Sequence, residues 1–332
     1  MKALVLNATH QPLDLEERPA PKPGAGQVVV RMKAASLNRR DYWITQGQYP
    51  GIEPPVILGS DGAGTVLELG EGVSQDWLHR EVIINPGVDW GDDEAAQSNQ
   101  FTILGLPQDG TFATELLVSA SQLHAKPAHL NWEAAAALPL AGVTAYRAVF
   151  SQGNLKPGQT VLITGIGGGV ATFALQFAVA AGANVWVTSS SLDKINRAIQ
   201  LGAKGGFNYR EESWGKEARE KMGAPNLIID SAAGKGYTAL LNLAAPGARI
   251  VNYGATAGPP EKIDMFKLFW KQLQLIGTTM GSPADFSAML DFVEARQIQP
   301  IVDATFPLEE GNTAIEQMEK SPQFGKYVLK IS

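Results

Sequence analysis

Residues 160–178 read TVLITGIGGGVATFALQFA. The apolar residues at the start of this stretch predict a strand, and the glycines that follow predict a tight turn. Apolar side chains then recur with the spacing of one helix face, at positions 170, 173, 174, 177, 178 and 181. Glycines let the backbone approach a pyrophosphate closely, and a helix N-terminus presents unpaired N–H groups and a partial positive charge to it. The stretch therefore predicts a dinucleotide site, and a flexible turn of an ordinary α/β domain is the alternative.

Strand-like segments recur after this stretch at similar intervals. They cover residues 184–189, 206–209, 226–231 and 249–254, with a helix predicted at 193–201. Strands that alternate with helices form right-handed βαβ units and a parallel sheet, and ligands bind at the carboxyl ends of its strands. Those ends carry Thr164, Ser189, Ser231 and Gly254. This half of the chain is predicted to be a doubly wound parallel sheet that binds a nucleotide.

Length and composition exclude several classes of protein. The chain has 332 residues, of which 45% are hydrophobic and 18% charged, and these values suit two globular domains. The net charge of −6 argues against nucleic acid or an anionic membrane as the main partner. The apolar run at residues 1–6 is too short for a signal peptide, and no apolar stretch is long enough to span a membrane, so we expect a cytoplasmic protein. Cysteine is absent, which excludes disulfides, thiolate catalysis and cysteine-ligated metals.

The remaining segments predict a second, β-rich domain. Short strands at residues 28–33, 65–69 and 81–85, separated by glycine-containing turns, suggest a barrel-like fold. Residues 91–100 form a polar, acidic loop, and residues 130–150 a helix-rich bridge into the nucleotide-binding half. Further elements are predicted as strands at 274–279 and 326–331 and a helix at 285–296. The catalytic domain is thus expected to be discontinuous, built from residues 1–122 and 282–332 around a nucleotide-binding domain at 123–281.

The chain resembles the medium-chain dehydrogenase/reductase superfamily over essentially its whole length, and most closely its zinc-free quinone oxidoreductase branch. The supporting segments are the glycine turn and residues 58–66, 138–146 and 325–329. The resemblance implies an α/β protein with a Rossmann domain and a GroES-like catalytic domain. The short-chain dehydrogenases are excluded because none of the seven tyrosines has a lysine four residues later.

A catalytic or structural zinc is predicted to be absent. Zinc-dependent members of the superfamily hold the catalytic metal with a cysteine in the segment matching residues 35–41 and with a Gly-His-Glu. Here the corresponding places read Ser36-Leu37-Asn38 and Gly59-Ser60-Asp61. The four cysteines of the structural site are missing as well, and the four histidines show no ligand spacing. Without a metal, no Lewis acid would polarise the oxygen of a simple alcohol.

The cofactor is predicted to be NADPH. An acidic residue about 20 positions past the glycine turn would select NAD, but the strand at 184–189 ends in serines and Lys194 follows. Ser189, Ser190, Lys194 and Tyr209 match residues that NADPH-dependent relatives use for the 2′-phosphate. Lys194 as an ordinary surface residue and Tyr209 as ordinary packing are the alternatives. The resemblance also implies cofactor contacts at Thr144, Gly165, Gly168, Gly169, Val170, Ser231, Gly254, Ala255, Thr279, Met280, Gly281 and Lys326.

The expected chemistry is hydride transfer to an acceptor that is already electrophilic, a quinone or an α,β-unsaturated carbonyl compound. Candidate catalytic residues are Asn38, Asp41, Tyr42 and Tyr49. Asn38 could donate a hydrogen bond to the acceptor carbonyl, and either tyrosine could donate a proton or stack on a flat acceptor. Alternatively, Asp41 caps a helix or pairs with Arg40, the tyrosines are pocket walls, and water supplies the proton.

Two other functions remain open from the sequence. One is the reduction of enoyl thioesters, and the other is NADPH binding with little turnover. Relatives pair their sheets across a two-fold axis at the strand matching residues 274–279, so a homodimer is expected by kinship.

Overall fold

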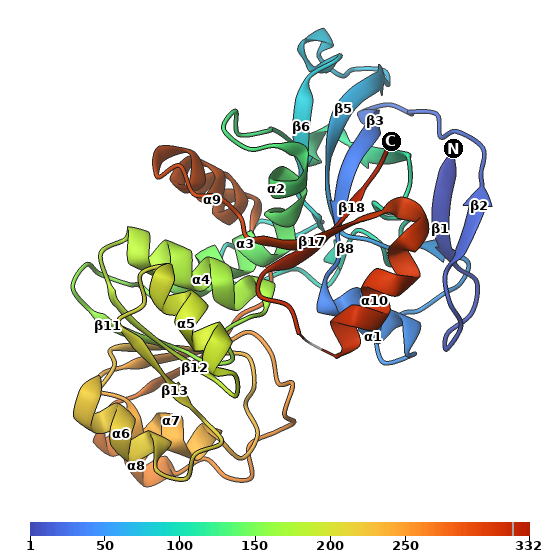
Figure 1. The fold of residues 1–332 in the computed structure, drawn as a ribbon. Helices are drawn as coiled ribbons and strands as arrows, with labels where there is room; N and C mark the ends of the chain where they lie inside the picture. The colour runs from blue at the N-terminus through green and yellow to red at the C-terminus, as the bar shows by residue number, and fades with distance from the viewer. Residues whose placement is uncertain (321) are drawn as a thin grey trace. The chain divides into compact units, whose positions relative to one another are not determined.

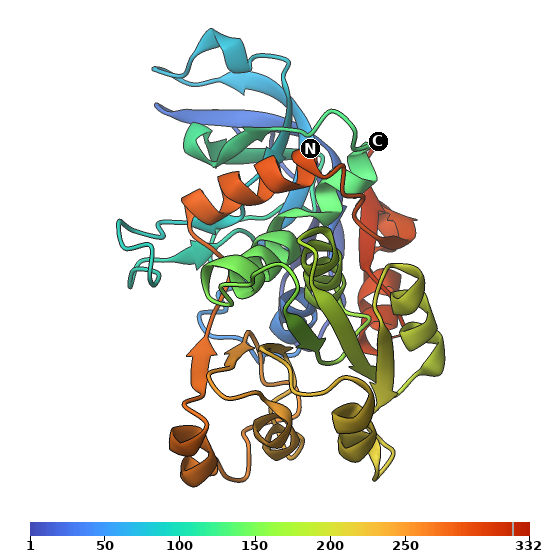
Figure 2. The same cartoon turned by 90° about the vertical axis from the view of Figure 1, so that its left-hand side faces the viewer.

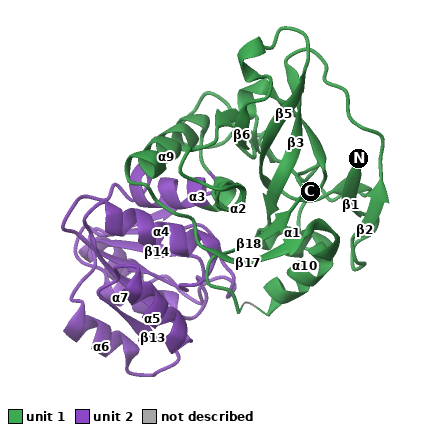
Figure 3. Ribbon diagram, turned by 45° about the horizontal axis from the view of Figure 1, so that its top comes forward, with its two compact units in different colours: residues 1–141, 281–332 green, residues 142–280 purple. Residues whose placement is uncertain are grey.

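The computed structural model describes residues 1–320 and 322–332, and these residues fold into two compact units (Figure 3). The first unit comprises residues 1–141 and 281–332, and the second comprises residues 142–280. Residues 123–141, which the sequence analysis placed in the nucleotide-binding domain, lie in the first unit. The reason is packing, because helix α2 (Trp132–Ala137) contacts β3 (Gln27–Ser36), β5 (Asp61–Leu69) and β18 (Lys326–Lys330).

The second unit contains a six-stranded sheet in which neighbouring strands run parallel. The strand order is β13-β12-β11-β14-β15-β16. Their bounds are β11 Thr160–Ile163, β12 Asn184–Ser189, β13 Gly205–Asn208, β14 Leu227–Asp230, β15 Arg249–Asn252 and β16 Gln274–Gly277. The chain leaves β11 toward β12 and β13 and then returns to the other side of β11 for β14, so the topological switch lies between β11 and β14. The predicted doubly wound parallel sheet is confirmed.

Helices connect the strands of this sheet. They are α4 Gly169–Ala180, α5 Leu192–Gln200, α6 Trp214–Lys221, α7 Tyr237–Leu243 and α8 Met265–Trp270. Helix α4 packs on β11 and β12, and α5 packs on β12 and β13. The apolar face of α4 that the sequence predicted is buried, with Phe173, Ala174 and Phe177 at most 1% exposed. Leu240 and Leu241 of α7 and Ile250 of β15 belong to one buried hydrophobic cluster.

The first unit is built mainly of antiparallel strands. Its larger sheet has the order β10-β6-β5-β3-β18-β17, with β9 also paired to β3, and a smaller sheet has the order β2-β1-β4. The remaining bounds are β1 Lys2–Leu6, β2 Asp14–Glu17, β4 Val56–Ile57, β6 Glu81–Ile84, β7 Gly87–Val88, β8 Thr102–Ile103, β9 Glu115–Ser119, β10 Leu123–Ala125 and β17 Val302–Pro307. The helices are α1 Arg39–Thr45, α3 Pro139–Tyr146, α9 Pro283–Ala295 and α10 Gly311–Glu319. Helix α3 continues into the second unit.

The two ends of the chain meet within the first unit. Strand β18, near the C-terminus, pairs antiparallel with β3, near the N-terminus, with Leu329 opposite Ala35. The N- and C-termini lie near one another in both Figure 1 and Figure 2. This pairing makes the unit discontinuous in sequence, as the sequence analysis expected. No helix among the described residues is both long and apolar enough to cross a membrane.

Candidate functional site

The glycine turn of the second unit joins β11 to α4 at the topological switch. Gly165 and Gly167 have φ values of +63° and +132°, in the region that favours glycine. Gly168 is the N-cap of α4, and a Cβ added there would meet no atom within 4 Å. The first turn of α4, which contains Gly169 and Val170, leaves N–H groups without acceptors inside the helix. This geometry suits an anionic phosphate group.

A buried carboxylate ties together the carboxyl ends of three strands beside this turn. Asp230, at the end of β14, is 1% exposed and accepts three hydrogen bonds. They come from Thr164 Oγ1 at 2.6 Å, Ala233 N at 2.8 Å and Asn252 Nδ2 at 2.8 Å. Tyr237 then donates to Asn252 Oδ1 at 2.7 Å. The network holds the ends of β11, β14 and β15 in register, and the sequence analysis did not identify it.

The residues proposed for the 2′-phosphate gather at the end of β12. Ser189 is 4% exposed, and its Oγ accepts the N–H of Ser191 at 3.1 Å. Lys194 lies in the first turn of α5 and is half-buried, whereas Tyr209 follows β13 and is 47% exposed. The backbone N–H of Tyr209 donates to Ser189 O at 3.3 Å, so the ends of β12 and β13 are adjacent.

The other predicted cofactor residues are spread along the same sheet edge and beyond it. Ser231 follows β14, Gly254 and Ala255 follow β15, and Thr279 and Met280 follow β16. Thr144 is buried on α3, and Gly281 belongs to the first unit.

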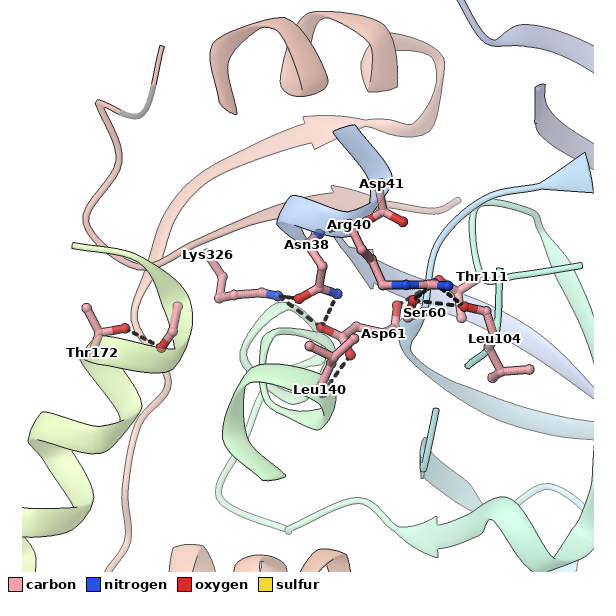
Figure 4. A network of polar contacts seen from close by, with 11 residues as sticks. Asn38, Arg40, Asp41, Ser60, Asp61, Leu104, Thr111, Leu140, Thr172 and Lys326 are labelled. Atoms are coloured by element: carbon pink, nitrogen blue, oxygen red, sulfur yellow. Dashed lines mark hydrogen bonds and ion pairs between the residues drawn. The ribbon is translucent and has the colours of Figure 1, made fainter. Parts of the chain in front are cut away.

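Lys326 lies in a buried polar cluster of the first unit, with Asn38 and Asp61 (Figure 4). Its Nζ donates to Asn38 Oδ1 at 2.6 Å and to Asp61 Oδ2 at 3.0 Å. Lys326 was predicted from the sequence as a cofactor contact, and neither of these two contacts was predicted. Asn38 Nδ2 donates to Asp61 Oδ2 at 2.9 Å, which closes the triangle. The three residues are 4%, 7% and 0% exposed, in the order Lys326, Asn38, Asp61.

Strand register brings these three residues together. Val328 on β18 is opposite Ser36 on β3, so continuing that antiparallel register places Lys326 opposite Asn38. Ser36 is also opposite Asp61 on β5. The second oxygen of Asp61 accepts the N–H of Leu140 at 2.7 Å, and its backbone carbonyl accepts from Thr111 Oγ1 at 2.8 Å. Both oxygens of the Asp61 carboxylate therefore accept hydrogen bonds.

Arg40 adds a second buried cation to the cluster. Its Nη1 donates to Ser60 Oγ at 2.6 Å and to Leu104 O at 2.7 Å, and Ser60 Oγ donates to Leu104 O at 2.8 Å. The guanidinium also lies over the ring of Tyr49, 5.1 Å from its centroid. Tyr49 is thus a packing partner of Arg40 in this structure.

Asp41 sits in the first turn of α1 and serves the helix N-terminus. Its Oδ2 accepts the backbone N–H of Asn38 at 2.7 Å. The pKa of this carboxyl is raised to about 6; burial is the main cause and Asp61 adds to it, whereas Arg40, the Asn38 N–H and Lys326 lower it. The capping role that the sequence analysis gave as an alternative for Asp41 is present.

Tyr42 points to a different partner. Its hydroxyl donates to Glu319 Oε1 at 3.0 Å, at the exposed contact between α1 and α10. Among the four candidate catalytic residues, Asn38 has the closest contact with the buried charges.

The donor set of this cluster does not fit zinc. The segment where zinc-dependent relatives have a cysteine contains Asn38, and the places of their histidine and glutamate hold Ser60 and Asp61. Asn38 Oδ1 and Asp61 Oδ2 are bound to the Lys326 ammonium, and Ser60 Oγ is bound to Arg40. A divalent cation would have to displace two positive side chains to reach these oxygens. In residues 1–320 and 322–332, no group of three or more histidine, cysteine, aspartate or glutamate side chains is placed to hold a metal.

Two known families match the chain. Residues 24–128 match the alcohol dehydrogenase GroES-like domain, and residues 169–295 match the family described as zinc-binding dehydrogenase. The zinc-type alcohol dehydrogenase-like protein YogA of Leptosphaeria maculans is 38% identical, with 97% of this chain and 95% of that protein covered. An acryloyl-coenzyme A reductase of Sulfurisphaera tokodaii is 29% identical over 99% of this chain and 100% of its own. The crystal structure of an NAD-dependent alcohol dehydrogenase is 34% identical, covers 100% of both chains and superimposes with a TM-score of 0.94.

Proposed function

Because this chain belongs to the medium-chain dehydrogenase/reductase superfamily of oxidoreductases, we propose that it is a zinc-independent, NADPH-dependent reductase of quinones or α,β-unsaturated carbonyl compounds. The observation that carries the proposal is the cluster around Asp61, whose oxygens already bind Lys326. Because Lys326 occupies the oxygens that a metal would need in order to polarise an alcohol, we infer that the acceptor is itself electrophilic.

The second unit supplies the cofactor site in this proposal. The glycine turn and the N-terminus of α4 hold the pyrophosphate, and the ends of β14, β15 and β16 line the nicotinamide side. NAD(P)H, when bound, supplies the hydride. Preference for NADPH is supported by serines at the end of β12, where NAD-selective members have a carboxylate, and by Lys194 after them.

The first unit supplies the hydrogen bond to the acceptor. Hydride delivery to the β-carbon of an enone moves an electron pair onto the carbonyl oxygen, and the enolate then takes a proton from water at the α-carbon. Asn38 Nδ2 has two hydrogens, of which one is donated to Asp61. The other donates to the developing oxyanion, and a donor of this kind contributes about 10²–10³ in turnover.

A turnover assay tests the proposal. Purified protein is mixed with NADPH and, in separate reactions, a quinone, an enone and an enoyl thioester, and NADPH absorbance is followed. We expect oxidation with a quinone or an enone, unchanged by a chelator, and no oxidation of a primary alcohol with NADP⁺. Tight NADPH binding with none of the three acceptors reduced would instead indicate a binding protein.

Enoyl-thioester reduction is the second candidate function. The observation that favours it is the resemblance to a relative named acryloyl-coenzyme A reductase. Its chemistry is the same, since an enoyl thioester is also an α,β-unsaturated carbonyl compound. Catalytic efficiency at least tenfold higher for the thioester than for a simple enone would select this candidate.

Cofactor preference is tested by Lys194→Ala. Loss of one charged contact to the 2′-phosphate should weaken NADPH binding about 10–100-fold and leave NADH binding unchanged. Lys204→Ala, which removes an exposed lysine of the same unit, is the matched control. Equal weakening of both cofactors by Lys194→Ala would remove its assigned role.

We also propose that the protein forms a homodimer through β16. This strand is at the end of the sheet order, so its outer edge is available for pairing. Beside it, Phe266, Phe269 and Trp270 of α8 are 63%, 61% and 73% exposed. Sedimentation should give a dimer for the native chain and a monomer for Trp270→Asp, and a monomeric native chain would contradict the proposal.

A further inference from the structure

Lys326 is a buried lysine that the resemblance predicts as a cofactor contact and that the structure places against Asn38 and Asp61, where the reaction proposed above gives it no role on the acceptor. Its ammonium is held by one carboxylate and one amide, at 3.0 and 2.6 Å, and the residue is 4% exposed. Replacing a buried ion pair by apolar residues of similar size is often neutral or stabilising. Stability therefore gives no sufficient reason for the Lys326–Asp61 ion pair at this position.

The chemistry of the three groups fixes the orientation of the Asn38 amide. An ammonium can only donate hydrogen bonds, and an ionised carboxylate can only accept them. Asn38 therefore turns Oδ1 toward Lys326, at 2.6 Å, and Nδ2 toward Asp61, at 2.9 Å. The flipped amide would place N–H groups against an ammonium and an oxygen against a carboxylate. One N–H of Nδ2 is left in a fixed direction.

We propose that Lys326 is a positioning residue for reduction. It supplies positive charge to the cluster, fixes the Asn38 amide so that its remaining N–H meets the oxygen of the acceptor, and adds positive charge close to that oxygen as it becomes negative. This inference rests on the proposed function. Asp61 is at the place of the glutamate in the Gly-His-Glu segment with which zinc-dependent members of the superfamily hold their metal. In this protein the Lys326 ammonium is bound to the Asp61 carboxylate.

The decisive variant is Lys326→Met, which keeps the approximate length of the side chain and removes the charge. We expect kcat with the enone or quinone to fall about 100-fold, the NADPH dissociation constant to stay within twofold, and Lys326→Arg to recover at least a tenth of the native kcat. Lys126→Met is the matched control, because the Lys126 side chain is also buried, at 7% exposure, and is paired with Glu81 at 3.2 Å. It should leave kcat within twofold.

Several results would overturn the inference. A native kcat in Lys326→Met would do so, and so would a loss of NADPH affinity as large as the loss of kcat, which would make Lys326 a cofactor contact. If the methionine variant does not fold, Lys326→Gln decides, since an uncharged donor should still lose at least tenfold in kcat. Native protein that reduces none of the acceptors would refute the proposed function and this inference together, whereas activity untouched by substitution at 326 refutes the inference alone.

A second measurement does not depend on turnover. Native protein dialysed against zinc chloride and then against metal-free buffer should retain less than about 0.1 zinc per chain, because the ammonium holds the oxygens that a metal would need. Stoichiometric zinc that is lost in Asp61→Ala would show that the metal displaces Lys326, and would overturn the assignment.

Discussion

Replacing Asp41 by asparagine should change how the stability of the protein depends on pH. Asp41 is 0% exposed, and its Oδ1 has no hydrogen-bond partner among the described residues. Burial raises its pKa from the ordinary 3.8 to about 6 in the folded protein. The folded state therefore binds this proton more tightly than the unfolded state does. The resulting stabilisation is fully present below pH 3.8 and is lost as the pH rises through 6.

The size of the effect follows from the two pKa values. A difference of about 2 units corresponds to about 3 kcal/mol of unfolding free energy. Asparagine has nearly the same shape, and its Oδ1 can still accept the Asn38 N–H that Asp41 accepts at 2.7 Å. Because asparagine does not titrate, the variant does not lose this stability as the pH rises from 3.8 through 6.

Urea unfolding between pH 4 and pH 8 measures this difference. We expect the unfolding free energy of Asp41→Asn, relative to the native protein, to rise by about 2.5 kcal/mol from pH 4 to pH 7 and then to level off. Subtracting one protein from the other cancels the titration of the groups they share. A difference that stays constant over the whole range would show that the carboxyl of Asp41 is not titrating there, and would refute the reasoning.

Four further substitutions test other parts of the structure. Lys326→Met leaves Asp61 buried without its cation and should lower the unfolding free energy by about 3–5 kcal/mol in urea. The double variant with Asp61→Asn should recover part of that loss. An unchanged midpoint of urea unfolding would show that the pair is dispensable for stability. Gly168→Val has open space for its side chain, so the unfolding free energy should stay within about 1 kcal/mol of the native value. NADPH binding, measured by fluorescence titration, should weaken at least 100-fold. Native affinity for NADPH would place the pyrophosphate elsewhere. Gly215 lies in α6, and a Cβ added there would meet no atom within 4 Å, so Gly215→Ala should raise the unfolding free energy by about 0.5–1 kcal/mol. A Cβ added at Gly64 would lie 2.2 Å from a backbone carbonyl oxygen, so Gly64→Ala should lower the melting temperature or abolish soluble expression.

Much of the secondary structure follows from the sequence pattern. The strands predicted at 184–189, 226–231 and 326–331 appear as β12, β14 and β18, and the helix predicted at 285–296 appears as α9 at 283–295. These segments combine short apolar runs with clear flanking turns, so local pattern and tertiary packing agree.

Strand β5 shows where local pattern failed. The strand was predicted from residue 65, but it begins at Asp61. Residues 62 and 64 are glycines, which weaken the local strand pattern. In the structure Gly64 pairs with Met32, and a Cβ there would strike the backbone carbonyl of Arg31. Close approach of the neighbouring strand explains the glycine, and sequence alone does not reveal that strand.

By itself, the sequence determined the cofactor half of this protein. A strand, a glycine turn and a helix that are contiguous in the chain must be neighbours in space, so residues 160–178 carry their own geometry. It also singled out Asn38 and Asp41. Only the tertiary structure assigned Lys326 to Asn38, from which it is separated by 288 positions. That contact depends on the register of β18 against β3, which the burial of a whole domain core sets and which no local pattern encodes.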